Sequence, residues 1–314
     1  MAIDIRDEQS IAVAKLYYES DMSQQKIAEV LNLSRPTVSR LLRYAKDQGY
    51  VNIKISDPVE SMAVLENRLQ IKYGLEVVKV ARASMETVIE QKKAIGKLAA
   101  EYLVNIVKDG DIIGIGWGST LYEMAKRLPV KPLPHTKVVE LKGGISLNSN
   151  KTYAQEILDS FTQAFSAEGR YLPLPVMFDT VEVKDIVYKD KFIKHILQLG
   201  RDANIAVFTV GSASEGSTIF HLGYFINEEE RQRIASSAVG DICSRFYDAD
   251  GKICEPELDA RTVGITLSDL KKKQSRILLA GGKHKVSAIK AALCGKFDTA
   301  LVTDQYTAKL LLAL

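Results

Sequence analysis

Apolar positions in the first fifty residues recur at helical spacing in short segments separated by turns. The pattern predicts helices over residues 7–19 and 23–31, and a third helix that follows Ser34. The inner i, i+3, i+4 and i+7 positions of the third helix are Val38, Leu41, Leu42 and Ala45. Ser23 and Ser34 are suitable N-caps, and Asn32 tolerates the left-handed backbone of a turn. The segment therefore has the pattern of a helix-turn-helix.

The third helix carries its cations on its outer face. Arg35, Ser39 and Arg43 fall at i, i+4 and i+8, and residues 35–46 contain four cations and no acid. Hydroxyl and guanidinium groups near a helix N-terminus can reach base edges and phosphates in the major groove of DNA. The expected DNA-binding residues are Ser23, Gln24, Ser34, Arg35, Pro36, Thr37, Ser39, Arg40 and Arg43. A helical hairpin with solvated basic residues is the alternative.

A strand and a break follow this segment. Residues 50–55 alternate between apolar and polar, which predicts a strand and hence a winged helix-turn-helix. Asp-Pro at 57–58 interrupts the pattern, so we expect a DNA-binding domain of residues 1–56 and a second domain of residues 57–314. Residues 59–73 form a further helical pattern, for which core packing, coupling between domains and a dimer seam are all open.

The second domain alternates strand-like and helical segments. Strands fit residues 76–80, 112–115, 138–141, 205–210, 239–244, 277–280 and 299–303, and helices fit 84–108, 119–128, 153–165, 191–203, 286–293 and 305–312. This repetition predicts an α/β fold, a doubly wound and mainly parallel sheet covered on both faces. Ligands bind such sheets at the loops that follow the carboxyl ends of the strands.

Glycine-rich loops at three predicted strand ends are candidate ligand sites. In GIGWGST, residues 114–120, backbone N–H groups and two hydroxyls can approach a phosphate, although a plain tight turn is the alternative. In VVELKGGIS, residues 138–146, the amine of Lys142 lies among apolar residues and glycines. Lost hydration would lower its pKa and suit it for ion pairing or Schiff-base chemistry, whereas a surface lysine before a turn fits equally well.

The third loop, ILLAGGKHK at residues 277–285, carries lysines that could meet an anion, or it is only a structural turn. Asp241 and Arg245, near another strand end, could bind sugar hydroxyls or simply each other. The expected ligand-binding residues are Gly116, Gly118, Ser119, Thr120, Lys142, Gly143, Gly144, Asp241, Arg245, Gly281, Gly282 and Lys283.

Composition adds little beyond an ordinary globular protein. A net charge of +3 over 314 residues is too small to indicate nucleic-acid binding without the local clustering described above. The three cysteines and four histidines lack metal-ligand spacing, so we expect free thiols in a reducing cytoplasm, no metal and no cofactor. The polar N-terminus is no signal peptide, and no apolar run approaches the ~20 residues that span a membrane.

A series of sequence blocks resembles the SorC-type bacterial repressors, in order through essentially the whole chain. The blocks are SQQKIAEVLNLSRPTVSRLLRYAKDQGYV, DGDIIGIGWGST, VVELKGGIS, RYLPLPVMFD, ANIAVFTVG, AVGDICSRFYDADG and ILLAGGKHKVSAIKAAL. The likeness is strongest to the members that control deoxyribonucleoside operons. The family pairs a DNA-binding domain with an effector domain similar to sugar-phosphate isomerases and glucosamine-phosphate deaminases.

The resemblance implies a repressor of a deoxyribonucleoside operon that leaves its operator when deoxyribose 5-phosphate binds. It implies a Schiff base between the sugar aldehyde and Lys142, with Asp241 near the sugar hydroxyls or the imine. The glycine loops would share phosphate and sugar binding, although the family pattern departs at residues 283–285. Family members assemble as homo-oligomers, dimers or larger, on paired operator sites. Repressors of another phosphorylated sugar and sugar-phosphate enzymes are the alternatives, and the DNA-binding module disfavours an enzyme.

Overall fold

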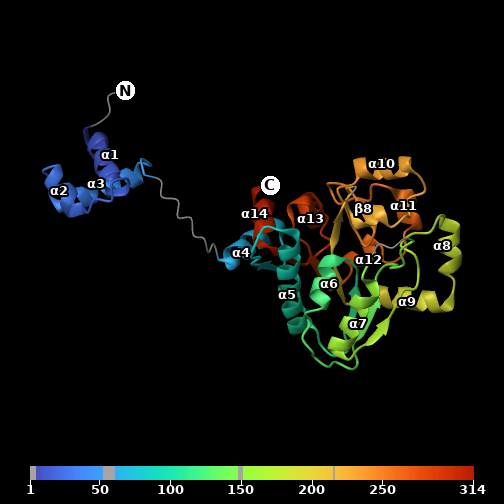
Figure 1. Ribbon diagram of the computed structural model, residues 1–314. Coiled ribbons are helices and arrows are strands. Elements are labelled where there is room, and N and C mark those ends of the chain that lie inside the picture. Colours follow the sequence, from blue (N-terminus) through green and yellow to red (C-terminus); the bar gives the residue numbers. More distant parts are fainter. Residues whose placement is uncertain (1–4, 52–60, 148–150, 215) are drawn as a thin grey trace. The chain divides into compact units, whose positions relative to one another are not determined.

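The computed structural model describes residues 5–51, 61–147, 151–214 and 216–314. Contacts divide the chain into two compact units, Met1–Pro58 and Val59–Leu314, which are described separately (Figure 1). Among the helices of the described residues, none is long and apolar enough to cross a membrane.

In the described part of the N-terminal unit, helices surround a small apolar core. Helix α1 spans Ile5–Tyr18, α2 spans Gln24–Val30 and α3 spans Arg35–Asp47. The core contains the predicted inner stripe of α3 together with residues of the other two helices: Val13, Ala14, Ile27, Ala28, Val38, Leu41, Leu42 and Ala45. The predicted helix-turn-helix is thus confirmed.

The ends of these helices have the predicted capping. Ser23 and Ser34 each accept a backbone N–H three residues further on at 3.2 Å, which satisfies a donor that the helix itself leaves free. Asn32 has φ 51° in the turn before α3, a backbone that asparagine tolerates better than most residues.

The predicted wing is largely outside the described residues. Tyr50 and Val51 have no strand structure, and residues 52–55 lie among those that the structure does not describe.

A parallel sheet forms the centre of the larger unit. Its strands are β1 (Val77–Ala81), β2 (Ile112–Ile115), β3 (Lys137–Glu140), β4 (Glu168–Arg170), β5 (Ile205–Phe208), β9 (Ser275–Leu279) and β10 (Ala300–Asp304), in the order β1-β10-β9-β5-β2-β3-β4. All pairings in this sheet are parallel, as predicted. The strands agree with the predicted segments to within about two residues, β4 excepted.

Helices cover both faces of the sheet because the strands bury side chains on both sides. Ile113, Val207 and Ile277 belong to a core with α5 (Val88–Ile106), α6 (Ser119–Ala125) and α7 (Ala154–Phe165) (Figure 1). Ala206 and Leu278 face the opposite core. The helices on that side are α4 (Met62–Tyr73), α12 (Leu267–Lys271), α13 (Val286–Cys294) and α14 (Gln305–Ala313), with α9 (Lys191–Asp202) in an adjoining cluster. The doubly wound fold class is confirmed.

The predicted parallel strand over residues 239–244 is wrong. The segment forms a small antiparallel sheet of β6 (Val210–Ser212), β7 (Gly240–Ile242) and β8 (Arg245–Tyr247). Strands β7 and β8 are joined through Cys243 and Ser244, which have φ values of 51° and 67°. Two successive residues with positive φ are typical of a tight hairpin turn, so the chain reverses here.

The remaining elements are short. They are α8 (Val181–Val187), α10 (Glu228–Ser237), α11 (Pro256–Arg261) and the 3-10 turns η1 (Thr218–His221) and η2 (Lys283–Lys285). The predicted helix over 84–108 begins only at Val88, because Thr87 caps it by accepting the N–H of Glu90.

Candidate functional site

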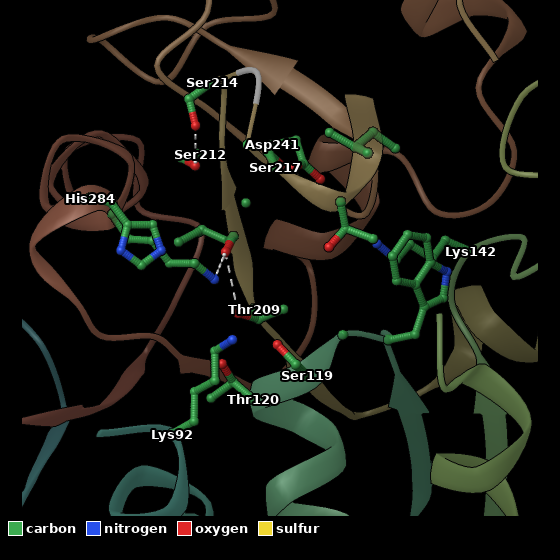
Figure 2. Close-up of a pocket in the computed structure, with 18 residues that line it drawn as sticks. Lys92, Ser119, Thr120, Lys142, Thr209, Ser212, Ser214, Ser217, Asp241 and His284 are labelled. Atoms are coloured by element: carbon green, nitrogen blue, oxygen red, sulfur yellow. Dashed lines mark hydrogen bonds between the residues drawn. The ribbon is translucent and has the colours of Figure 1, made fainter. Parts of the chain in front are cut away.

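A cavity of about 390 Å³ opens at the carboxyl ends of the parallel strands (Figure 2). It lies beside the loops that follow β2 and β5, neighbours in the sheet from which the chain continues to opposite sides. Such a switch point is where open α/β sheets bind ligands. The lining residues include Lys92, Trp117, Gly118, Ser119, Thr120, Lys142, Thr209, Ser212, Ser214, Ser217, Thr218, Asp241, His284 and Lys285.

Lys142 occupies one side of this cavity. Its side chain is buried, and burial lowers the pKa of the amine, an effect that the carboxylate of Asp241 opposes. Nζ lies 3.4 Å from the centroid of the Trp117 ring and 3.5 Å from Ser244 Oγ. The predicted loss of hydration is therefore present, and a larger share of this lysine is neutral and nucleophilic than of an exposed one.

Asp241 lies on β7 and faces the same cavity (Figure 2). Its carboxyl is buried, which raises its pKa, and the nearby Lys142 amine opposes that shift. Oδ2 accepts the backbone N–H of Ser244 at 3.0 Å. A carboxyl with a raised pKa beside an amine can hold a proton and return it to a ligand.

The side of the cavity away from Lys142 is cationic. Figure 2 shows Lys92 and His284 there, and Lys285 also lines the cavity. Burial and the neighbouring Lys92 ammonium lower the pKa of Lys285 to about 8, although Asp241 opposes the shift. Burial, with Lys285 and Lys92 nearby, lowers the pKa of His284 as well. An anion bound among these groups would stabilise their protonated forms, because it offsets the repulsion between the cations.

Hydroxyl groups line much of the remaining wall. Ser119 and Thr120 follow Gly118, whose φ of 139° is one that glycine adopts without strain. The segment after β5, which includes β6 and the start of η1, adds Thr209, Ser212, Ser214, Ser217 and Thr218. Hydroxyls of this kind can donate to phosphate oxygens or exchange hydrogen bonds with a sugar.

Several predicted glycines build the loops and do not line the cavity. A Cβ on Gly143 would lie 2.0 Å from the carbonyl oxygen of Pro175, so the chain passes there only without a side chain. Gly144 lines a neighbouring pocket beside Glu140, and Gly116 packs against the backbone of Phe208. Gly143 thus fixes the path of the chain directly after Lys142.

The loop after β9 contributes different residues from those predicted. Gly282 donates its N–H to Thr307 Oγ1 at 2.7 Å, and neither Gly281 nor Gly282 lines the cavity. Lys283 is exposed and outside the cavity, whereas the next two residues, His284 and Lys285, line it.

Arg245 is also absent from this cavity, and its partner is Asp259 instead of Asp241. Its guanidinium donates to Asp259 Oδ1 at 2.6 Å and to four backbone carbonyls of residues 259–265. In the hairpin register Asp241 pairs with Phe246 and Ile242 pairs with Arg245, so the two charged side chains leave opposite faces. Arg245 therefore fixes the neighbouring loop.

Residues that the sequence did not single out complete the site. Lys92 comes from the second turn of α5, and Trp117 comes from within the predicted glycine loop. The hydroxyl groups of the cavity wall could have been predicted from the run of serine and threonine after β5, because that run directly follows a strand that ends at this edge of the sheet.

The second candidate surface is the outer face of α3. Arg35, Pro36, Ser39, Arg40 and Arg43 are exposed along it. Thr37 and Gln24 are partly buried, and the first turn of α3 contains no acidic residue. The predicted DNA-binding residues from Ser34 to Arg43 thus lie on α3 and its cap, with the inner face of the helix in the core, whereas Ser23 and Gln24 lie at the start of α2.

Residues 57–313 match the family model described as "Putative sugar-binding domain", and residues 7–48 match that of sigma-70 region 4. The chain is 48% identical over 306 residues to the deoxyribonucleoside regulator of Bacillus subtilis (strain 168), covering 98% of this chain and 97% of that protein. It is 31% identical over 304 residues to the sorbitol operon regulator of Klebsiella pneumoniae, covering 96% of each. The crystal structure of the full-length sorbitol operon regulator SorC from Klebsiella pneumoniae matches with a TM-score of 0.74 at 30% identity, covering 97% of this chain and 98% of that chain. The chain therefore belongs to the SorC-type family of sugar-binding transcriptional regulators.

Proposed function

We propose that this regulator represses a deoxyribonucleoside operon and leaves its operator when deoxyribose 5-phosphate binds in the cavity. The observation that carries the proposal is one cavity with a buried amine on one side and clustered cations on the other. An open-chain aldose phosphate has the matching ends, an aldehyde and a dianion. The name of the Bacillus subtilis relative supports deoxyribonucleosides as the source of the sugar.

The reaction at Lys142 is imine formation. The neutral amine attacks the aldehyde carbon, a C–N bond forms, and the carbonyl oxygen leaves as water after it gains two protons. Asp241 is the group placed to hold one of these protons, because its buried carboxyl has a raised pKa and faces the same cavity. The phosphate would lie toward Lys92, His284 and Lys285, with hydroxyls of the cavity wall donating to its oxygens.

Helix α3 is the proposed reading head on DNA. Its exposed arginines and hydroxyls can contact base edges and flanking phosphates, with the predicted residues of α2 beside them. A single short helix makes few base contacts, so we expect a homo-oligomer that places two or more copies on paired half-sites. The effector releases DNA only if it binds the released arrangement more tightly than the DNA-bound one.

The first experiment measures intact mass after borohydride reduction with deoxyribose 5-phosphate. Wild type should gain one reduced sugar phosphate, and Lys142→Ala should gain none. Lys283→Ala is the matched control, because this exposed lysine of the loop after β9 lies outside the cavity and should leave the adduct intact. An adduct on Lys142→Ala, or none on wild type with deoxyribose 5-phosphate or any other aldose phosphate, would refute the covalent proposal. An adduct with another aldose phosphate only would replace the effector.

DNA binding is tested with operator and unrelated duplexes in parallel. Arg40→Ala should weaken operator binding by roughly tenfold or more and unrelated DNA less, as for a base contact. Lys15→Ala, on the exposed surface of α1, is the control for a general loss of positive charge. Equal losses on both duplexes would make Arg40 a phosphate contact.

A further inference from the structure

The indole of Trp117 contacts the Lys142 segment at two separate places. Its ring lies under the amine, with Nζ 3.4 Å from the centroid, well within the roughly 6 Å range of a cation–π interaction. Its Nε1–H donates to the carbonyl oxygen of Gly143 at 2.8 Å. One buried side chain therefore holds both the reactive end of Lys142 and the backbone that follows it.

The nearest other contacts of the amine are weaker. The hydrogen bond to Ser244 Oγ is 3.5 Å long, at the limit of such a bond. The titratable groups that act on Nζ are Asp241, Cys243 and Lys285. Burial raises the pKa of Cys243 to about 11, so its thiol is neutral at pH 7. Among these contacts, Asp241, the electron-rich ring and the weak acceptor Ser244 Oγ favour a positive charge at this nitrogen, and Lys285 opposes it.

We propose that Trp117 is the positioning residue of Lys142, holding Nζ against its ring face as an ammonium in the free regulator and as an iminium in the sugar complex. The second half of this proposal rests on the covalent effector binding described above. The two cations share one nitrogen and one charge, so a ring that stabilises the first also stabilises the second. A hydroxyl partner gives less to the iminium, which has lost two of the three N–H donors.

Two variants separate the ring from its hydrogen bond. Trp117→Phe keeps an aromatic face but lacks the Nε1–H donor to Gly143, whereas Trp117→Leu lacks both. If the ring face is what matters, the phenylalanine variant should resemble wild type and the leucine variant should not. Both variants are compared with wild type by circular dichroism and by operator binding, which reports that the chain has folded.

The decisive readout is the pKa of Lys142, measured by the pH dependence of its labelling with acetic anhydride and peptide mapping. We expect the Lys142 pKa to fall by about one unit in Trp117→Leu, since a desolvated cation–π contact stabilises the charged form by that order. Trp117→Phe should restore most of the difference. An unchanged Lys142 pKa in Trp117→Leu, or equal shifts in both variants, would overturn the role of the ring.

The borohydride assay then separates this inference from the proposed function. If wild type forms no adduct, covalent binding is refuted and the iminium half of the inference falls with it. The ammonium half is still decided by the pH dependence of acetic anhydride labelling. If wild type reacts, the adduct equilibrium is compared at a pH above the Lys142 pKa, where the free amine is neutral and only the iminium gains from the ring. There the adduct on Trp117→Leu should form about tenfold more weakly, and Trp117→Phe should recover it. Full adduct formation by Trp117→Leu at that pH and at wild-type sugar concentration would overturn the iminium half. Because Trp117 is the sole tryptophan of the sequence, its fluorescence reports sugar binding in wild type directly.

Discussion

Lys285 should make anion binding in the cavity depend on pH. Burial and the nearby Lys92 hold the pKa of its amine at about 8, well below the value of 10.5 for an exposed lysine. Below pH 8 the amine is protonated with or without a ligand, so its titration does not affect affinity. Above pH 8 the empty site loses the proton and an anion restores it, so binding must take up a proton.

The size of the effect follows from this linkage. Affinity should fall by up to about tenfold for each pH unit above the free-state pKa, until the pKa of the anion-bound amine is reached. A phosphate ester completes its second ionisation near pH 6, so it adds little slope in this range. The lowered pKa of His284 likewise keeps that ring neutral throughout it. Lys92 and Lys142 also have lowered pKa values and can add to the slope, so a variant must isolate Lys285.

The assay uses a ligand that cannot form an imine, the alcohol made by reducing deoxyribose 5-phosphate. Its dissociation constant is measured by tryptophan fluorescence from about pH 6.5 to about pH 9.5 in wild type and Lys285→Arg. Arginine stays protonated across this range, so the variant should bind about as well at neutral pH and lose part of the slope above pH 8. Equal slopes in the two proteins, or an affinity in wild type that does not change with pH, would refute the reasoning.

Three further predictions concern stability. Burial raises the pKa of Asp298 to about 7, so its carboxyl disfavours the fold increasingly as pH rises from the unfolded pKa to that value. The free energy of unfolding is measured in urea for Asp298→Asn, with the exposed Asp250→Asn as control. The stability advantage of Asp298→Asn over wild type should grow by about 2–3 kcal/mol from about pH 5 to about pH 8. Arg261→Ala should cost about 3–5 kcal/mol in thermal unfolding, because it leaves the buried Glu230 without its charged partner, and a cost near zero would contradict this. Ser34→Ala should destabilise the helix-turn-helix by about 1 kcal/mol, and Ser34→Gly by a few tenths.

Much of the fold was predictable because its signals are local. Strands that are buried on both faces are continuous apolar runs, which mark their positions along the chain. The caps of α2 and α3 depend on serines within three residues of the N–H groups that they accept. The reversal at Cys243 and Ser244 was missed because two positive φ values usually require glycine or asparagine, and this turn contains neither. Helix α8 buries none of its residues, so it has no inner face that periodicity could reveal.

The site was only partly predictable, for a different reason. The rule that ligands bind at strand ends pointed to Lys142 and the Gly118–Thr120 loop, and the structure brings both to the lining of one cavity. Arg245 was assigned wrongly because closeness in sequence to Asp241 says nothing of which hairpin face each residue takes. Lys92 lies on a helix and resembles any solvated lysine in sequence, so only the packing of α5 against the sheet brings it to the cavity.

The residues that hold the loops differ from those that line the cavity, which indicates how a regulator of this fold can change its effector. Gly143 packs against the Pro175 carbonyl, Gly281 packs against the Asp304 and Ile95 side chains, and Arg245 donates to backbone carbonyls. Replacing any of them would therefore disturb the loops at the sheet edge. The cationic and hydroxyl groups of the cavity come from four segments, the start of α5 and the loops after β2, β5 and β9. Lys285 donates to the Val210 carbonyl, but most of these side chains contribute little to holding the fold together. Substitution there should alter which sugar phosphate binds while Lys142 and Trp117 keep their geometry.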